Sequence, residues 1–392
     1  MEAGNTERIV SEMARIIRVD IKRYDYPLLG EFKFFKTGTR PSILVRLTDE
    51  NGVQGWGQSV PVETWTYETA ETAETTLRQY LAPAVLGADP TDLADVHARM
   101  ERAIRPSFSI GQPLCKAGVD LACYDLWGKQ TRKSVSDLLG GAKKTQVTLS
   151  WTIQSPTIAG AEDQLRQGKA LGYGNFNIKI GYPQMPAYDL ELVRAVMAFA
   201  PNGFHWADAN TNYDLDTAMA MAPKLANLGL KGLESPLPPN RIRAYQTLKR
   251  QGALPILMDE GIVSPVEVDE FIALDMFDGV AMKVARCGGL WNASRIVRVL
   301  QENDLLLFAS GLTDPELSMA ATAHFFAWAG LEFPAAVNGP QYLVGRGTMD
   351  PAFRARGDIM PVPTGPGLGV ELPGEMQTSL TTVVEAREAL PA

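Results

Sequence analysis

Five short apolar segments between residues 176 and 283 each end in a single ionisable residue. The segments are Phe-Asn-Ile-Lys179, His-Trp-Ala-Asp208, Lys-Gly-Leu-Glu234, Ile-Leu-Met-Asp259 and Val-Ala-Met-Lys283. Their last residues are 29, 26, 25 and 24 positions apart, and each interval accommodates one strand, one helix and two short loops. This is the repeat of a parallel α/β barrel, in which the carboxyl ends of the strands form the mouth. The pattern therefore predicts a barrel with these five side chains at its mouth.

The same alternation extends to both sides of this stretch. Apolar runs predict eight strands, at 146–152, 176–181, 204–208, 231–235, 255–259, 279–284, 305–310 and 334–338. Apolar residues at helical spacing predict intervening helices, among them 188–200 and 290–303. We expect the barrel to span residues 143–345.

The first 142 residues have a different pattern. Residues 15–26 alternate between apolar and polar side chains, and a hairpin is expected over 42–57 around Asn51-Gly52. Three helical patterns follow, at about 66–85, 91–103 and 112–129. Strands followed by helices predict an α+β domain over residues 1–142. The loop-rich tail, 346–392, is expected to pack back on this domain.

Length and charge limit the alternatives. The 392 residues exceed the roughly 250 of one barrel, which agrees with a second domain. A net charge of −8 argues against nucleic acid or an anionic membrane as a partner. Three cysteines in no C-x-x-C pattern, an acidic start and no long apolar run favour a cytoplasmic protein with reduced thiols.

The three acids at consecutive strand ends, Asp208, Glu234 and Asp259, point to a metal site. Carboxylate oxygens without His or Cys suit Mg²⁺, with Mn²⁺ as the alternative. Converging carboxylates repel one another, so a cation would stabilise them. The competing interpretation is a set of separate acids that cap helices and pair with Lys or Arg.

Lys179 and Lys283 flank these acids along the chain. A buried lysine near a cation loses proton affinity and can remove a proton from carbon next to a carboxylate. Two amines on opposite faces would allow removal from one side and return on the other. A Schiff-base aldolase is an alternative use of one lysine, but it leaves the carboxylates unexplained. Solvated loop charges are another.

This combination of residues resembles the enolase superfamily, within it the muconate-lactonizing group, over roughly residues 15–375. Further text supports the resemblance, namely Asp208-Ala-Asn, Met258-Asp-Glu-Gly, Lys283 followed by Gly288-Gly289, and Gly118-Val-Asp-Leu-Ala-Cys-Tyr-Asp-Leu. It implies a modified (β/α)8 TIM-type barrel with an α+β capping domain formed by the N-terminal part and the C-terminal tail. It also implies Mg²⁺ on the three acids and catalysis by the two lysines.

The resemblance implies an isomerase that forms a metal-stabilised enolate from a small carboxylate substrate. Racemisation or epimerisation of an amino-acid-like carboxylate is the leading expectation. β-Elimination of a hydroxy acid, cycloisomerisation, and non-catalytic binding of a small acid are alternatives. By analogy, a homo-oligomer, either dimer or octamer, is expected.

The sequence departs from the family pattern at the first Lys of its Lys-x-Lys motif, which is Asn177 here. Asn177 can still donate a hydrogen bond to a substrate carboxylate. His97, His205 and His324 do not form the His-Asp pair of the mandelate-racemase and sugar-acid dehydratase groups, which therefore fit less well.

Substrate specificity in this family comes from two capping-domain loops, here about 26–39 and 55–67. They offer Tyr26, Phe32, Phe34, Phe35, Lys36, Trp56, Trp65 and Tyr67, which predicts an apolar or aromatic lid. The residues expected to bind substrate are Asn177, Asn210, Asp314, Trp56 and Tyr26.

Overall fold

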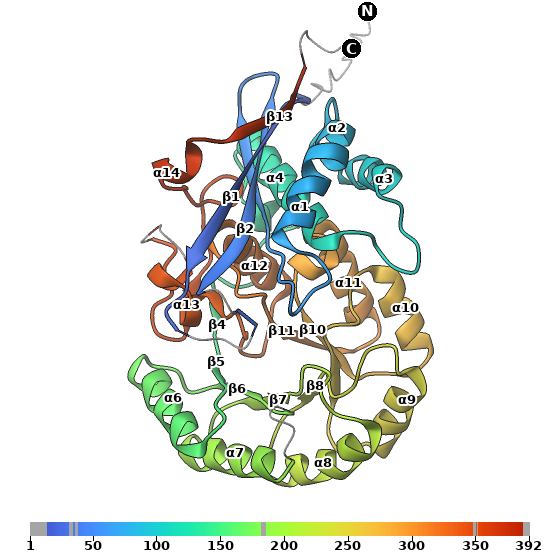
Figure 1. Cartoon of the computed structure of the whole chain (residues 1–392), viewed down its shortest axis with the longest axis vertical. Helices are drawn as coiled ribbons and strands as arrows, with labels where there is room; N and C mark the ends of the chain where they lie inside the picture. Colours follow the sequence, from blue (N-terminus) through green and yellow to red (C-terminus); the bar gives the residue numbers. More distant parts are fainter. Residues whose placement is uncertain are drawn as a thin grey trace, which may run out of the picture.

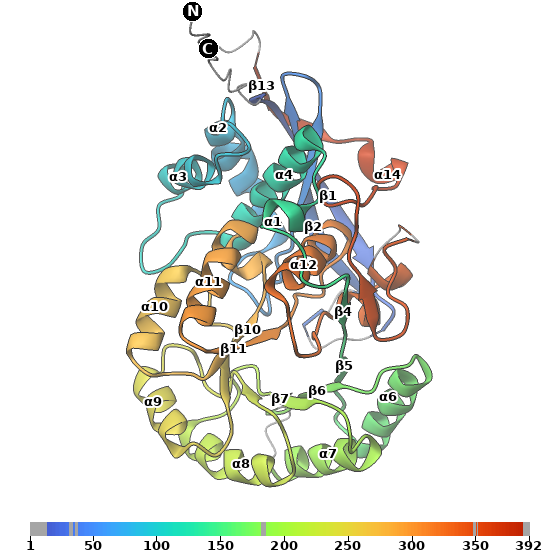
Figure 2. The same ribbon diagram turned by 180° about the vertical axis from the view of Figure 1, so that it is seen from behind.

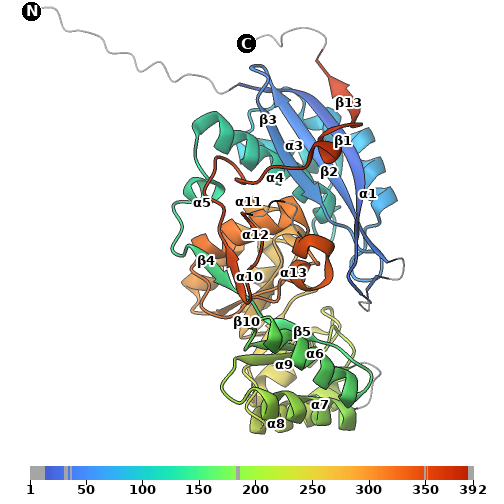
Figure 3. The ribbon, with the colours of Figure 1, turned by 90° about the vertical axis from the view of Figure 1, so that its left-hand side faces the viewer.

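The computed structural model contains two main β-sheets, one in an upper domain and one in a lower barrel (Figure 1, Figure 3). The described residues are 14–30, 34–35, 38–181, 186–347, 350 and 352–386. The upper sheet has four strands in the order β13-β1-β2-β3, and the barrel sheet has seven in the order β11-β10-β9-β8-β7-β6-β5. A separate antiparallel pair joins β12 to β4.

The strands are β1 Ile16–Pro27, β2 Thr39–Asp49, β3 Gln54–Ser59, β4 Gln146–Thr148, β5 Trp151–Ile153, β6 Phe176–Lys179, β7 His205–Asp208, β8 Leu233–Glu234, β9 Ile256–Met258, β10 Gly279–Met282, β11 Leu306–Ala309, β12 Ile359–Pro361 and β13 Thr381–Glu385. The α-helices are α1 Ala70–Thr76, α2 Ala82–Val85, α3 Leu93–Ala103, α4 Pro113–Thr131, α5 Val135–Leu138, α6 Ile158–Ala170, α7 Pro186–Phe199, α8 Leu215–Asn227, α9 Ile242–Gln251, α10 Pro265–Ala273, α11 Leu290–Glu302, α12 Glu316–Ala329, α13 Gly339–Tyr342 and α14 Gly374–Gln377. Shorter turns of other helix types are η1 Leu77–Leu81, η2 Ala285–Cys287 and η3 Val344–Gly347.

The capping domain is made from both ends of the described chain. β1 pairs antiparallel with β2 on one side and with β13 on the other. Figure 3 shows this sheet with α1, α3 and α4 above the barrel. The expected capping domain, formed by the N-terminal part and the C-terminal tail, is confirmed.

Helix α4 packs unusually close to β3 because β3 presents two glycines to it. A Cβ atom at Gly57 would lie 2.0 Å from the carbonyl oxygen of Gly118, and one at Gly55 would lie 2.4 Å from that of Ala122. Since side chains alternate along a strand, Trp56 faces the opposite side of the sheet. This packing therefore requires glycine at both Gly55 and Gly57.

The single helix expected over 66–85 is interrupted. α1 begins at Ala70, and the chain then passes through the π-helical turn η1 into α2. Pro83 has no N–H to donate to a carbonyl one α-helical turn earlier, and its ring crowds that carbonyl. The wider turn, in which Ala82 N–H bonds to the Leu77 carbonyl, accommodates the proline.

Among the described residues, the barrel sheet has seven strands instead of the eight expected. The segment predicted as a strand at 334–338 forms two isolated parallel bridges, from Ala335 to Leu149 and from Ala336 to Ser310. These bridges join the two edges of the sheet and close the barrel. Pro334 lacks a donor for ladder pairing, which is one reason why pairing does not extend in that direction. The segment 146–152 is divided, because β4 pairs with β12 while β5 joins the barrel.

Helices α6 to α11 follow their strands around the outside of the barrel (Figure 2). α12 is buried along its whole length. Among the described residues, no helix is both long and apolar enough to cross a bilayer. The three cysteines, Cys115, Cys123 and Cys287, are buried free thiols.

His324 on α12 predicts acid sensitivity. It is hydrogen-bonded to Ser136 Oγ at 3.3 Å and to the Leu368 carbonyl at 3.1 Å. Burial lowers the pKa of His324 to about 4. Neutral His324 therefore contributes its full share of the free energy of unfolding above pH 6.5. About 3 kcal/mol of that free energy is lost as the pH falls toward 4, because the unfolded chain takes up the proton more readily. Urea unfolding between pH 7 and 4.5 should show a shallower decline for His324→Gln than for the unmodified chain. Equal slopes would contradict this assignment.

Candidate active site

The carboxyl ends of five consecutive strands bring the five predicted ionisable residues together. Lys179, Asp208 and Glu234 are the last residues of β6, β7 and β8, while Asp259 and Lys283 directly follow β9 and β10. All five are buried. β7, β8 and β9 separate the two lysine strands on one side, and β11, the closing segment and β5 separate them on the other. The lysines therefore lie across the mouth from each other, with the acids on the arc between them.

Each lysine is ion-paired with the neighbouring aspartate. Lys179 Nζ contacts Asp208 Oδ2, and Lys283 Nζ contacts Asp259 Oδ2. Lys283 Nζ also lies 4.0 Å from Glu234 Oε1. Buried charges require such opposite partners, because desolvation of an isolated charge costs several kcal/mol.

An apolar layer lies directly below these residues. Trp206, Leu257, Ala281, Phe308 and Ala336 form a buried cluster. Three of them, Trp206, Leu257 and Ala281, precede Asp208, Asp259 and Lys283 by two positions, so strand alternation puts them on the same inward face. Trp206 Nε1–H donates a 2.7 Å hydrogen bond to Glu234 Oε2. Trp206 therefore orients Glu234. Alternation along β7 indicates that Trp206 faces inward with Asp208, but not that its N–H meets Glu234.

The oxygen ligands of Asp208, Glu234 and Asp259 are of the kind that a hard divalent cation prefers. Within the described chain, no group of three or more His, Cys, Asp or Glu side chains is arranged to hold a metal. Asp208 and Asp259 are instead engaged by the lysine ammonium groups. Two carboxylate oxygens, Glu234 Oε1 and Asp259 Oδ1, are buried there without a hydrogen-bond partner among the described residues. Such oxygens would gain from a cation, and the all-oxygen set matches Mg²⁺ or Mn²⁺.

The close approach of the carboxylates and lysines shifts the pKa values of Glu234 and Lys179. Burial, and next the negative charge of Asp208, raise the pKa of Glu234 to about 8. Burial acts to lower the pKa of Lys179, but the charges of Asp208 and Glu234 outweigh it and the net shift is upward. The structure thus differs from the expectation of a lysine with lowered proton affinity, because the carboxylates here are balanced by the lysines themselves.

A second set of contacts holds the acids in place. Asn210 Nδ2–H bonds to Asp208 Oδ2 at 3.0 Å and to Glu260 Oε1 at 3.2 Å. Arg286 Nε lies 3.4 Å from Asp259 Oδ1. Asn210, expected to bind substrate, therefore contacts a predicted metal ligand. Glu260 and Arg286 were not singled out, although one follows Asp259 directly and the other follows Lys283 by three positions.

Asn177 lies two positions before Lys179 and faces the barrel interior with it. It is fully buried. Neither Oδ1 nor Nδ2 has a hydrogen-bond partner in the part of the chain that the structure describes. An unpaired buried amide is costly, so a ligand that satisfied it would be favoured.

An aromatic lid covers the lysines. The rings of Phe34 and Trp65 stack with centroids 4.0 Å apart and an interplanar angle of 4°. The Trp65 centroid is 5.0 Å from Lys283 Nζ and 5.9 Å from Lys179 Nζ, so one ring spans both amines. The lid cluster also contains Phe35, Val60, Val62, Leu114, Ala117, Ala285, Leu312 and Tyr342.

Trp56 and Tyr26 lie elsewhere, which corrects their expected place in the lid. Trp56 packs under the Arg46 guanidinium, 5.5 Å from its ring centroid. Tyr26 is buried in the main core, where its hydroxyl accepts a hydrogen bond from Gln58. Both are on strands of the capping sheet, whose alternation directs them away from the lid cluster.

Asp314 is engaged in its own turn. Its Oδ1 accepts a hydrogen bond from Ser318 Oγ at 2.7 Å, and its Oδ2 accepts one from Leu312 N–H at 3.2 Å. These contacts fix the loop that leads into α12, so the structure gives Asp314 a local role. Phe32 and Lys36, expected in the lid, lie outside the described residues.

Comparison with known proteins agrees with this geometry. The family model for the mandelate racemase/muconate lactonizing enzyme N-terminal domain matches residues 28–140, and the enolase C-terminal domain-like model matches residues 160–376. The chain belongs to this family. Enzymes of the family generally use a divalent metal.

Individual relatives are isomerases. Muconate cycloisomerase 1 of Rhodococcus opacus is 27% identical over 363 residues, covering 91% of this chain and 96% of that protein. N-succinyl-L-Arg/Lys racemase of Bacillus cereus is 26% identical over 290 residues, covering 72% and 76%. The crystal structure of 2-chloromuconate cycloisomerase from Rhodococcus opacus superposes with a TM-score of 0.85 at 25% identity, covering 92% and 98%. The expected membership among enolase-superfamily isomerases is confirmed.

Proposed function

We propose that the protein racemises or epimerises a small carboxylate with an amino-acid-like α-carbon. The observation that carries the proposal is the placement of Lys179 and Lys283 across the barrel mouth from each other. With a cation on the three carboxylates, Lys179 would lose the negative partners that raise its pKa, and the unprotonated Nζ atom of one lysine then removes the α-proton from one face. The Nζ atom of the other returns a proton to the opposite face.

The remaining residues bind and orient the substrate. Asp208, Glu234 and Asp259 would hold Mg²⁺, or Mn²⁺ in its place, which when bound supplies positive charge against the negative charge that develops on the substrate carboxylate. The buried amide of Asn177, which has no hydrogen-bond partner among the described residues, would donate a hydrogen bond to the substrate. The Phe34–Trp65 pair keeps water from the lysines and favours a substrate with an apolar side chain.

Cycloisomerisation is the second candidate, because muconate and chloromuconate cycloisomerases are among the relatives. A cycloisomerase needs acid–base chemistry at one face only, so one of the two lysines would be dispensable for it. β-Elimination of a hydroxy acid likewise needs acid–base chemistry at one face only. Simple binding of an acid needs neither lysine as an acid or base.

Proton exchange in D₂O with Mg²⁺, followed by NMR, tests these functions. The panel contains amino acids, N-acyl amino acids, hydroxyproline-like acids and lactones. α-Proton exchange with inversion, lost with EDTA and in Lys179→Met, is expected for a racemase. Exchange or product formation without inversion would point to the second candidate. Normal Mg²⁺ binding with no turnover of any compound would favour an acid-binding protein.

Trp206→Phe tests how Glu234 is oriented. Phenylalanine fills most of the same space but has no N–H for Glu234 Oε2, so Mg²⁺ affinity should fall roughly 10–100-fold. Isothermal titration calorimetry measures the affinity. Phe308→Leu alters the same apolar layer without removing a hydrogen bond, and it serves as the control. Equal affinity in the Trp206 variant and the unmodified chain would rule out this role.

A further inference from the structure

Asp120 on the capping-domain helix α4 contacts the barrel directly behind Lys283. Its Oδ1 accepts a hydrogen bond from Leu290 N–H at 2.6 Å, and its Oδ2 accepts one from Trp291 N–H at 3.3 Å. These are the first N–H groups of α11, whose N-cap, Gly289, has no side chain to bond them. Asp120 therefore caps a barrel helix from a different domain, with a favourable charge at its N-terminus.

His97 completes this contact. Its Nε2 atom lies 2.8 Å from Asp120 Oδ2, and both side chains are buried. His97 belongs to α3, so a second capping-domain helix fixes the orientation of the Asp120 carboxylate.

The backbone that Asp120 touches leads straight back to Lys283. Gly289 has φ +109°, and a Cβ atom there would lie 2.2 Å from Asp120 Oδ1. Its N–H bonds to the Val284 carbonyl at 3.2 Å, and Asn292 Nδ2–H bonds to the Cys287 carbonyl at 3.0 Å. Residues 284–289 thus form a closed turn, and Lys283 is the residue before it.

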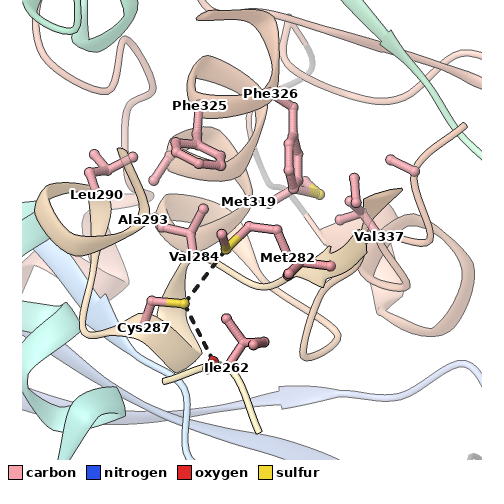
Figure 4. Packing of buried hydrophobic residues seen from close by; sticks show 14 of the residues in the cluster. Ile262, Met282, Val284, Cys287, Leu290, Ala293, Met319, Phe325, Phe326 and Val337 are labelled. Atoms are coloured by element: carbon pink, nitrogen blue, oxygen red, sulfur yellow. Dashed lines mark hydrogen bonds between the residues drawn. The ribbon is translucent and has the colours of Figure 1, made fainter. Parts of the chain in front are cut away.

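The barrel side of this turn is packed equally firmly. Figure 4 shows Val284, Cys287 and Leu290 among buried apolar side chains of the barrel. The Cys287 thiol contacts the Ile262 carbonyl oxygen and Met282 Sδ, both at 3.6 Å. Movement of the turn is therefore limited by the core on one side and by Asp120 on the other.

We infer that Asp120 is a positioning residue for Lys283 and not for Lys179. This inference rests on the proposed two-lysine function. Lys179 ends β6, on the opposite side of the barrel mouth, and its backbone is not part of this turn. Loss of Asp120 should displace one lysine and leave the other in place, so the proton transfers at the two faces should separate.

The same helix supplies a matched control. Asp125 is also buried, and it accepts hydrogen bonds from Trp56 N–H at 2.7 Å and Leu368 N–H at 2.8 Å. It lies against a second positive-φ glycine, Gly367, whose Cβ atom would be 2.2 Å from Asp125 Oδ1. These contacts hold β3 and the C-terminal tail, not the turn behind Lys283. Asp125→Ala thus removes a comparable contact without touching the site.

The first experiment measures α-proton exchange at each face, starting from each stereoisomer of an active panel compound. In Asp120→Ala, exchange at the Lys283 face should fall roughly 100-fold, as expected for a misplacement of about 1 Å, while the Lys179 face stays within about twofold. Asp125→Ala should leave the ratio of the two faces unchanged. Equal loss at both faces in Asp120→Ala would overturn the inference. Asp120→Asn, which keeps an acceptor for Leu290 N–H, is the milder variant if Asp120→Ala does not fold.

Hydrogen–deuterium exchange by mass spectrometry tests the positioning without a substrate. Asp120→Ala should lose protection over residues 283–291 while residues 176–181 keep theirs, and Asp125→Ala should keep both. Equal loss of protection over residues 283–291 and 176–181 in Asp120→Ala, or no loss over either, would overturn the inference. If the unmodified chain turns over no compound but Asp120→Ala selectively loses protection over residues 283–291, the proposed function is wrong. The positioning of the backbone around Lys283 by Asp120 would still hold.

Discussion

Lys283→Met is expected to stop α-proton exchange at one stereochemical face while exchange at the other face continues. Methionine keeps the length and apolar stem of this buried side chain and removes the amine. A positioned acid–base group contributes roughly 10²–10⁴-fold, so the affected face should lose at least about 10³-fold. α-Proton exchange in D₂O, followed by NMR from each stereoisomer of the substrate, measures each face separately.

Two further variants serve as comparisons for Lys283→Met. Lys179→Met should give the mirror-image loss. Lys249→Met removes a lysine that is ion-paired with Asp275 away from the mouth, and it should leave both faces unchanged. If both faces still exchange in Lys283→Met, Lys283 is not the base for either face and the two-base mechanism is wrong.

Glu234→Gln is expected to abolish tight Mg²⁺ binding. Glu234 lies on the strand between those of Asp208 and Asp259, so its loss removes the central one of three negative charges. Mg²⁺ binding depends strongly on carboxylate ligands, so the Mg²⁺ affinity should fall at least about 100-fold. Isothermal titration calorimetry measures this affinity. Thermal stability without metal should not fall, because glutamine keeps an acceptor for the Trp206 N–H and removes a carboxyl group whose ionisation burial and Asp208 already oppose.

Asp189→Asn is the matched control for this variant. Asp189 is also a fully buried acid, but it lies on α7, where it accepts hydrogen bonds from Gly181 N–H at 3.1 Å and from the Tyr213 hydroxyl at 2.7 Å. Its replacement should lower the melting temperature and leave Mg²⁺ affinity unchanged. Unchanged affinity in Glu234→Gln as well would remove the metal-site proposal.

Much of the fold could be predicted because strand and helix periods are local properties of the sequence. The barrel strands from 176 to 310 and the helices at 93–103, 113–131 and 290–302 lie within a few residues of their expected positions. Two of the errors occur where a proline intervenes, and a third, the division of 146–152, occurs where β12 pairs with β4. Pro83 divides a predicted helix into two, and Pro334 precedes a segment that forms bridges instead of a strand.

The site could be predicted in part. The regular spacing of ionisable residues at strand ends put Lys179, Asp208, Glu234, Asp259 and Lys283 at one rim, where the structure has them. The lid could not be predicted residue by residue. Trp56 and Trp65 look equivalent in the sequence, but Trp56 lies in β3 on the face opposite α4, whereas Trp65 lies in the loop after β3 and joins the lid cluster.

The sequence by itself determined which residues end the barrel strands, because the apolar runs and their spacing are local and repeat. Only the tertiary structure decided which partners those residues meet. Trp206 below Glu234, Trp65 above both lysines and Asp120 behind Lys283 come from other strands or from the capping domain. Such contacts depend on barrel closure and on domain packing, and neither leaves a periodic signal along the chain.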